Sequence, residues 1–146
     1  MITLYIWNTV KGDRWGHTSL ELDGRVYISW WPGDLDGRLP TFAENNTFQR
    51  DIELEGQPNH QIAITGLDER EIKKWWMNWR GNSRFYVAVG KNCSSTVAEA
   101  LQSGGGDEYA KAGGWTPSLA TVWTPSTVLT YAQAIQRGLA FKQASQ

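Results

Sequence analysis

Residues 16–32 read GHTSLELDGRVYISWWP and predict a β-hairpin with a histidine at its beginning. Residues 25–31 are rich in β-branched and aromatic side chains, and residues 17–22 alternate between two faces, and both patterns are typical of strands. Asp23-Gly24 between them suits a tight turn, because glycine tolerates the positive φ that such turns require. Pro32 ends the second strand. The hairpin is therefore expected to form two neighbouring strands of one antiparallel sheet.

The first strand of this hairpin has two different faces. Side chains alternate along a strand, so one face is apolar and suits a core, whereas the other is polar. The apolar face carries Thr18, Leu20 and Leu22, and the polar face carries His17, Ser19 and Glu21. A histidine on the polar face is a candidate functional residue.

Residues 90–101, GKNCSSTVAEAL, contain the only cysteine of the chain. The pattern predicts that Cys93 lies in the first turn of a helix that follows a strand. At that position the helix dipole and unpaired N–H groups favour a thiolate, and the same N–H groups can hold a developing oxyanion. Asn92 and Ser94 are expected to border the substrate beside this thiol. Cys93 is therefore the candidate nucleophile.

A thiol nucleophile needs a base, and the chain offers only two histidines. His17 lies on a polar strand face, whereas nothing reactive surrounds His60 in the sequence, so His17 is the candidate base. An imidazole base needs a third group that fixes its orientation. Ser29 in the adjacent strand and Glu21 in the same strand are both candidates, and the sequence does not choose between them.

The remaining pattern predicts further elements around this site. Strands are expected at residues 2–7, 60–65 and 85–89, and a short strand at Asp51–Leu54 in the otherwise irregular stretch 33–58. Helices are expected after Asp68, from Cys93 to Ser103 up to the glycines 104–106, at each WTPS copy (115–118 and 123–126), and along Val128, Ala132, Ile135 and Leu139.

Nine tryptophans in 146 residues are more than a core of this size needs. Trp75, Trp76 and Trp79 follow Ile72 at helical spacing and are expected to pack in the core. Trp15, Trp30 and Trp31 flank the hairpin strands, so we expect them to border the substrate groove, where indoles also suit a bilayer interface.

Length and composition exclude several classes of protein. A chain of 146 residues suits a single domain, 1–146, and its net charge of −1 gives no general attraction to nucleic acid. One cysteine excludes an internal disulfide or a multi-cysteine zinc site, and we expect neither a metal nor a cofactor. No apolar run is long enough to span a bilayer, and the start of the chain does not resemble a signal peptide.

The motifs GHTSLEL, YISWWP and NCSSTVAEAL together resemble the circularly permuted NlpC-type papain-like domains. These include the lecithin:retinol acyltransferase-like enzymes. In this branch the histidine strand precedes the cysteine helix, as His17 precedes Cys93. The resemblance matches Ser29 to the third polar position, where the acyltransferases carry histidine, and Asn92 to the residue before the nucleophile. It implies an α+β fold with a small antiparallel sheet packed against helices, and the nucleophile at a helix N-terminus.

YISWWP and the three glycines after the cysteine helix are most similar to a bacterial subgroup that often ends secreted toxins. The resemblance implies a domain made in the bacterial cytoplasm and secreted as an effector or toxin. A cognate immunity protein is a further partner that it implies.

Three functions fit these observations. The first is a cysteine hydrolase or transacylase that attacks phospholipid acyl esters through a thioester and touches the membrane peripherally. The second is a peptidase or amidase that acts on peptidoglycan or protein. The third is a tryptophan-rich binding module without catalysis, in which Cys93 would be buried and unreactive.

Overall fold

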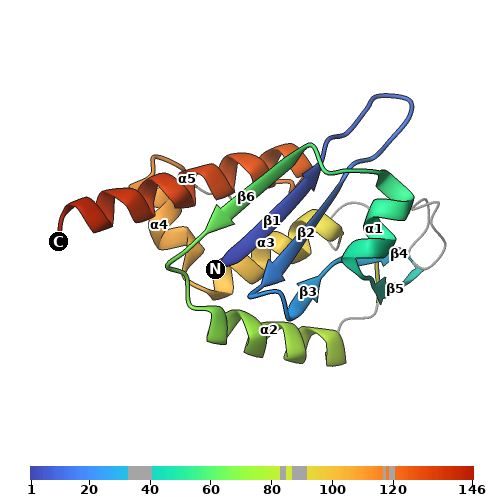
Figure 1. Cartoon of the computed structure of the whole chain (residues 1–146), viewed down its shortest axis with the longest axis horizontal. Helices are drawn as coiled ribbons and strands as arrows, with labels where there is room; N and C mark the ends of the chain where they lie inside the picture. Colours follow the sequence, from blue (N-terminus) through green and yellow to red (C-terminus); the bar gives the residue numbers. More distant parts are fainter. Residues whose placement is uncertain (33–40, 83–84, 87–91, 117, 119–120) are drawn as a thin grey trace.

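The computed structural model describes residues 1–32, 41–82, 85–86, 92–116, 118 and 121–146. Within these ranges the fold is α+β, as predicted: a small antiparallel sheet packs against helices (Figure 1). This sheet has the strand order β3-β2-β1-β6 and comprises β1 (Ile2–Trp7), β2 (His17–Leu22), β3 (Val26–Ile28) and β6 (His60–Ile64).

The central strand β1 pairs with β2 on one side and β6 on the other, and its register aligns the apolar residues of all three strands. Leu4 lies opposite Leu20 and Ile62, so each apolar side chain has a neighbour on the adjoining strand. Leu4 and Leu20 have no exposed surface. The predicted alternation in residues 16–22 is confirmed for the core face.

The predicted single strand at residues 25–31 is wrong, because the chain changes sheets at Ser29. Ile28 pairs with Leu20 in the first sheet, whereas Trp30 pairs with Asn45 in a second one. This second sheet has the order β4-β5-β7 and comprises β4 (Trp30–Pro32), β5 (Thr41–Asn45) and β7 (Phe85–Tyr86). The expected strand at 85–89 is confirmed at its first two residues, and residues 87–89 lie outside the described ranges.

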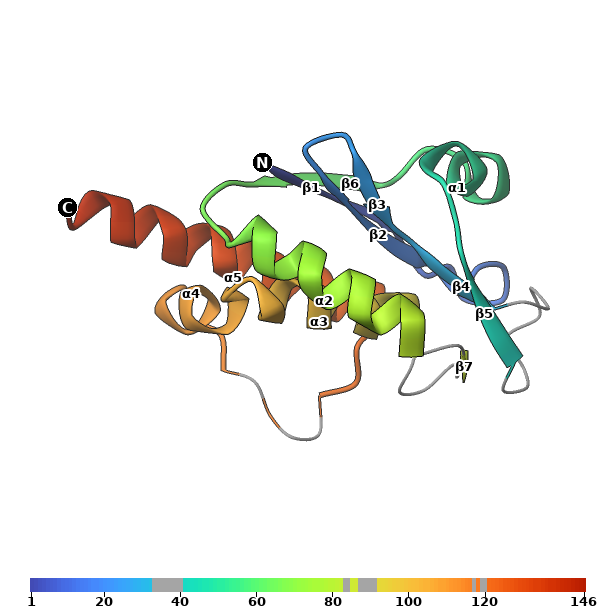
Figure 2. The ribbon, with the colours of Figure 1, turned by 90° about the horizontal axis from the view of Figure 1, so that it is seen from below.

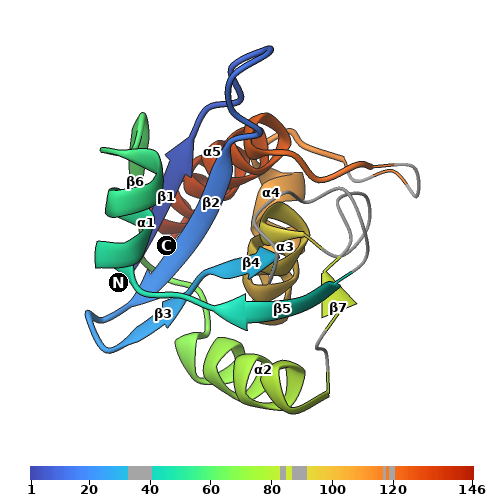
Figure 3. The same ribbon diagram turned by 90° about the vertical axis from the view of Figure 1, so that its right-hand side faces the viewer.

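Helices occupy both faces of the first sheet. α2 (Glu69–Asn82), α3 (Cys93–Ser103), α4 (Gly106–Ala112) and α5 (Pro125–Ala144) form a layer on one side, and Figure 2 shows that α1 (Phe48–Glu55) lies on the other. Figure 3 shows α1 on one side of β1 and β2 and α3 on the other. β2 is therefore covered from both sides at its beginning, and His17 and Ser19 on its polar face are buried.

The predicted strand at Asp51–Leu54 is wrong, since this segment belongs to α1. The Thr47 side chain caps the helix by accepting a hydrogen bond from the Arg50 N–H at 3.2 Å. Gly56 ends it with a positive φ of 78°, which favours glycine. The polar composition of this stretch concealed the helix, because a short amphipathic helix with few apolar residues has the same composition as a loop.

The tryptophan stripe of α2 packs in the core, as predicted. Trp76 and Trp79 are 1% and 8% exposed, and Trp75 is half-buried beside them. Trp30 stands edge-on to Trp76 and Trp79, with ring centroids 6.0 and 4.3 Å away. Trp30 therefore belongs to the core, and the expectation that it borders a groove is corrected.

The C-terminal helices agree in part with the sequence pattern. The glycines after α3 supply a left-handed residue at Gly105, φ 92°, but α4 begins directly afterwards and was not predicted. The second WTPS copy starts α5, with Thr124 as cap and Pro125 in the first turn. In the first copy Trp115 and Thr116 are not helical, and Pro117 lies outside the described residues. Among the described residues, no helix combines the length and apolar character needed to cross a membrane.

Candidate active site

The structure brings His17 and Cys93 together although they are far apart in sequence. His17 begins β2 and Cys93 begins α3, and the two side chains lie close enough for each to shift the pKa of the other. Their neighbours also meet, since the hydroxyls of Thr18 and Ser94 are 3.4 Å apart. The buried end of the sheet thus abuts the N-terminus of the cysteine helix. Cys93 is 7% exposed and His17 is 2% exposed.

A capping box holds the start of α3 in place. The Asn92 side chain accepts a hydrogen bond from the Ser95 N–H at 2.8 Å, and the Ser95 hydroxyl accepts one from the Asn92 N–H at 2.8 Å. The Asn92 amide also donates to the carbonyl of Trp123 at 3.4 Å. Asn92 therefore fixes the position of the thiol, and both Asn92 and Ser94 are buried rather than set along an open groove.

Behind His17 lies a buried carboxylate that the sequence analysis did not identify. The Nε2 atom of His17 is 2.9 Å from the Ser29 hydroxyl and 3.2 Å from Asp51 Oδ2. Ser29 in turn donates to the same oxygen of Asp51 at 2.7 Å. Because Nε2 faces these groups, Nδ1 is the ring nitrogen left for the thiol. The resulting order is thiol, imidazole, carboxylate, with Ser29 bridging the last two.

Asp51 has no exposed surface, and hydrogen-bond donors surround both of its oxygens. Oδ1 accepts from the Trp31 indole at 2.6 Å and from the Asn46 amide at 3.2 Å. Oδ2 accepts from the hydroxyl of Tyr27 as well as from Ser29 and His17. A carboxylate satisfied in this way stays ionised in a buried position.

Two indole rings lie against the imidazole of His17. The ring centroid of Trp31 is 4.4 Å from that of His17 at an interplanar angle of 30°, and that of Trp7 is 5.4 Å away at 42°. The electron-rich face of an indole attracts a cation. This arrangement favours the protonated form of His17 and fixes the plane of the ring.

The charges of the site favour a thiolate–imidazolium pair. Burial alone would lower the pKa of His17, but the Cys93 thiolate and the hydrogen-bonded Asp51 carboxylate raise it to about 9. Burial also opposes ionisation of Cys93, yet the charge and hydrogen bond of His17, the backbone of Thr18 and the Ser94 hydroxyl lower the pKa of the thiol to about 7. Burial likewise opposes ionisation of Asp51, but His17, Tyr27 and Ser29 hold its pKa below the usual value. Such a pair is a nucleophile beside a proton donor.

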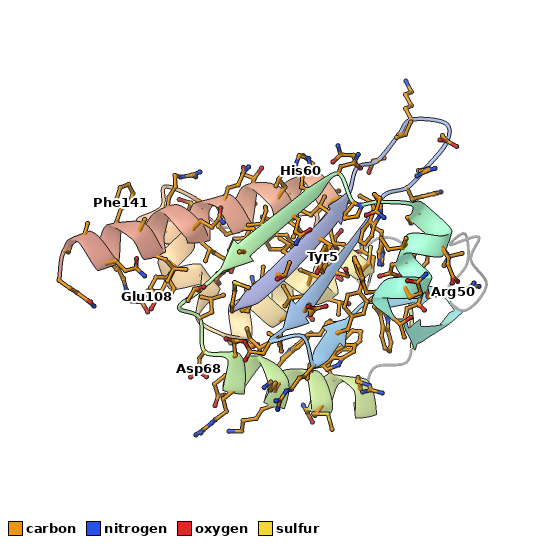
Figure 4. All side chains as sticks on the ribbon, viewed as in Figure 1. Tyr5, Arg50, His60, Asp68, Glu108 and Phe141 are labelled. Atoms are coloured by element: carbon orange, nitrogen blue, oxygen red, sulfur yellow. The ribbon has the colours of Figure 1, made fainter. Side chains whose placement is uncertain are left out.

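Three other residues considered in the sequence analysis, Glu21, His60 and Trp15, have no described contact with the His17 imidazole. Glu21 pairs with Thr3 and Tyr27 along the sheet, four residues from His17 on the same strand, and makes no described contact with the imidazole. His60 begins β6 at the sheet edge, as labelled in Figure 4. Trp15 is 75% exposed on the connection between β1 and β2, which stands out from the body in Figure 1. Trp15 is thus the one expected groove tryptophan that faces solvent.

Asp51 could have been found from the helix signals around it. Thr47 and Gly56 bracket an eight-residue helix, and Phe48, Asp51, Ile52 and Glu55 recur at helical spacing. A carboxylate in the inward stripe of an amphipathic helix is unusual, because a buried charge needs partners. That anomaly is the signal for a functional group.

Within the described ranges, no three His, Cys, Asp or Glu side chains gather closely enough to hold a metal ion. The site's side chains offer a thiol, an imidazole and a carboxylate in a line, and this arrangement suits nucleophilic and acid–base chemistry.

Comparison with known proteins shows that the chain is similar to short parts of two bacterial toxins. It is 35% identical over 77 residues, 52% of its length, to the multifunctional-autoprocessing repeats-in-toxin proteins of Vibrio cholerae serotype O1 and Vibrio vulnificus. The chain spans only 2% and 1% of the length of these toxins, and no solved structure matches it. These similarities point to a bacterial toxin or effector domain. The model of the family described as the IcsB middle domain matches residues 38–146, a range that contains Asp51 and Cys93, and the chain therefore belongs to that family.

Proposed function

We propose that this domain is a cysteine-dependent hydrolase or transacylase of the permuted papain-like type, which attacks acyl esters of lipids. One observation carries the proposal: Cys93, His17 and Asp51 come from three separate elements and meet in a buried line of thiol, imidazole and carboxylate. Structural cysteines do not need an imidazolium and a carboxylate aligned behind them. The order of the residues, with His17 before Cys93, matches the permuted branch.

In the first half of the reaction, the Cys93 thiolate attacks the ester carbonyl carbon and a C–S bond forms. The carbonyl oxygen becomes an oxyanion, and the N–H groups in the first turn of α3 are suited to stabilise it. The tetrahedral intermediate then collapses, the C–O bond to the leaving alcohol breaks, and that alcohol takes the proton of the His17 imidazolium. The products of this half are a thioester on Cys93 and a lysophospholipid.

In the second half, neutral His17 takes a proton from water or from an acceptor hydroxyl. The activated oxygen attacks the thioester carbonyl, the C–S bond breaks, and the thiolate–imidazolium pair is restored. Water gives a free fatty acid, whereas a lipid hydroxyl gives a transferred acyl chain. Asp51 stays ionised throughout and keeps the imidazole oriented.

A lipid substrate is favoured by the connection between β1 and β2, which leads directly into His17. Trp15 is 75% exposed there, and Val10 on the same connection is 48% exposed. The base of the connection is held by the Thr9 hydroxyl, which donates to the Trp15 carbonyl at 2.8 Å. Exposed apolar side chains on this connection, with Trp15 only two residues before His17, are suited to rest in a bilayer interface.

The test is to incubate the domain with neutral and with anionic liposomes and to measure the products by mass spectrometry. We expect lysophospholipid with free fatty acid, or an acyl chain moved to a second lipid, and loss of these products in Cys93→Ala. Binding to the liposomes should survive raised salt, since it depends on apolar insertion. Absence of acyl release from both liposomes would overturn the lipid substrate.

An amide substrate is the second candidate, because the imidazolium of His17 stands ready to protonate a nitrogen leaving group. Peptidoglycan fragments and peptides are incubated in parallel with the liposomes. Cleavage that stops in Cys93→Ala, together with intact liposomes, would assign the domain to peptidases and amidases. A Cys93 that reacts only as an ordinary buried thiol would support a binding module instead.

A further inference from the structure

Trp31 contacts both the candidate base, His17, and its carboxylate partner, Asp51. Its indole N–H donates to Asp51 Oδ1 at 2.6 Å, and its ring lies against His17 with the centroids 4.4 Å apart and the planes 30° from parallel. The side chain is half-buried and comes from β4, in the second sheet. One residue therefore links the second sheet to the imidazole and to the carboxylate that orients it.

The hydrogen bond from Trp31 is the shorter of the two bonds to Oδ1. Asn46 donates to the same oxygen at 3.2 Å, which is near the long limit for an N–H donor, whereas 2.6 Å is typical of a strong charge-assisted bond. The opposite oxygen, Oδ2, faces His17. The Trp31 bond thus opposes rotation of the carboxylate away from the imidazole.

The ring of Trp31 supplies a second, separate contribution. An indole face stabilises an imidazolium and keeps water from it. The ring centroid of Trp7 also lies 5.4 Å from that of His17. The Trp7 indole N–H donates to the Gly56 carbonyl at 2.9 Å, so the Asp51 contact distinguishes Trp31 from Trp7.

We propose that Trp31 is a positioning residue, whose indole N–H holds Asp51 toward His17 and whose ring covers the imidazolium, so that the thiolate on Cys93 is maintained. This role rests on the proposed cysteine chemistry and goes beyond it. It also replaces the expectation that Trp31 contacts substrate. The titratable groups that face this centre are Cys93 from α3, Asp51 and Glu55 from α1, and Tyr27 from β3.

The experiment measures how fast iodoacetamide alkylates Cys93 between pH 5 and pH 10, without any substrate. Trp31→Phe keeps an aromatic cover but removes the N–H donor, and Trp31→Leu removes both. Trp75→Phe is the matched control, because Trp75 is a half-buried indole in the α2 stack. Circular dichroism checks that each variant is folded, and Trp31→Phe decides the test if Trp31→Leu does not fold.

In the wild type we expect the alkylation rate to rise with a midpoint near neutral pH. Trp31→Phe should move that midpoint upward by about one unit, which lowers the rate at acidic pH about tenfold. Trp31→Leu should move it further, and Trp75→Phe should leave it unchanged. A residue that only packs would change the maximal rate through access to the thiol, without a shift of the midpoint.

Two failures are distinguishable in this design. A wild-type midpoint at the pH of an ordinary thiol would overturn the cysteine chemistry itself, and with it the role of Trp31. A low wild-type midpoint that Trp31→Phe does not move would leave the cysteine chemistry standing and would overturn the role of Trp31 alone.

Discussion

At the scale of single residues, the Asp51 carboxylate orients the imidazole of His17. Its two oxygens accept hydrogen bonds from His17, Ser29 and Trp31, among others, and the side chain has no exposed surface. A buried carboxylate is costly to maintain unless its donors are in place. The same donors that keep it ionised also prevent it from turning, so the imidazole meets a fixed negative charge.

Asp51→Asn is expected to fold and to lose activity on the order of 10³-fold. The amide keeps the shape of the side chain but removes the charge, and its N–H₂ group disfavours the imidazole tautomer that serves the thiol. The measurement is the rate of product formation together with the rate of Cys93 alkylation.

Ser29→Ala is the comparison for Asp51→Asn. It should lose less activity, because the direct contact of His17 Nε2 with Asp51 at 3.2 Å remains. Equal losses in the two variants would show that Ser29, rather than the carboxylate, orients the base. A fully active Ser29→Ala beside an inactive Glu21→Gln would restore the other candidate of the sequence analysis.

Cys93→Ala is expected to keep the fold while activity falls to the background of the assay. The thiol adds little packing at the start of α3, since Asn92 and Ser95 hold that end of the helix. Thermal unfolding followed by circular dichroism checks stability, and product analysis checks activity. Residual turnover in this variant would mean that another residue is the nucleophile.

A residue of this site was predictable from the sequence only where the chain contains few residues of the same type. One cysteine and two histidines left a short search, so Cys93 and His17 could be named. Asp51 is one of fifteen acidic residues, and it reaches His17 only through a helix that composition did not indicate. Its burial is a tertiary property, which no local pattern states directly.

At the scale of elements, the contact between α4 and α5 depends on two glycines. A Cβ atom added to Gly138 would lie 1.8 Å from the Tyr109 carbonyl oxygen, and one added to Gly113 would lie 1.9 Å from that of Ala134. The two helices therefore approach each other at backbone distance, which side chains of ordinary size would prevent.

Gly138→Ala is expected to lower the free energy of unfolding by about 1–3 kcal/mol, because backbone atoms must move apart to admit the methyl group. Gly81→Ala is the matched control within α2, where the added Cβ meets nothing within 4 Å. Alanine favours helix over glycine, so this change should raise stability by up to about 1 kcal/mol. Urea denaturation of both variants measures the difference. A Gly138→Ala protein as stable as the wild type would show that α4 and α5 separate without cost.

Elements with a clear hydrophobic periodicity or turn motif were predictable from the sequence. Elements whose limits depend on which strand they pair with were not. The α2 stripe at 72–79 and the hairpin turn at 23–24 follow from local patterns. The break at Ser29 does not, since it arises where the strand leaves β2 and pairs with β5 instead. The residue at that break is also the one that bridges His17 and Asp51.

At the scale of the whole molecule, folding transfers a proton from the Cys93 thiol to the His17 imidazole and releases none to solvent near pH 8. The pKa of His17 rises from 6.5 to about 9 on folding, so its contribution to stability is present below pH 6.5 and is lost as pH rises through 9. The pKa of Cys93 falls from 9.0 to about 7, so its contribution is present above pH 9 and is lost as pH falls through 7. Between pH 7 and 9 the two changes cancel, because the pair holds one proton in both states.

The stability that this pair contributes is therefore expected to be flat between pH 7 and pH 9. The measurement is the free energy of unfolding of the wild type minus that of the double variant His17→Ala, Cys93→Ala, at several pH values in this window. The subtraction removes other groups, such as the amino terminus, that titrate in the same range. A steep difference curve would mean that the thiol and the imidazole titrate independently.

The contact of His17 with two indole rings has a spectroscopic consequence. The chain has two histidines, so its imidazole protons give only two sets of magnetic resonance signals. Circulating π electrons shield nuclei that lie over a ring face, and the ring of His17 lies against those of Trp7 and Trp31. His60 stands apart at the edge of the sheet. The upfield set is therefore expected to belong to His17, and it offers a label for following the protonation of the candidate base.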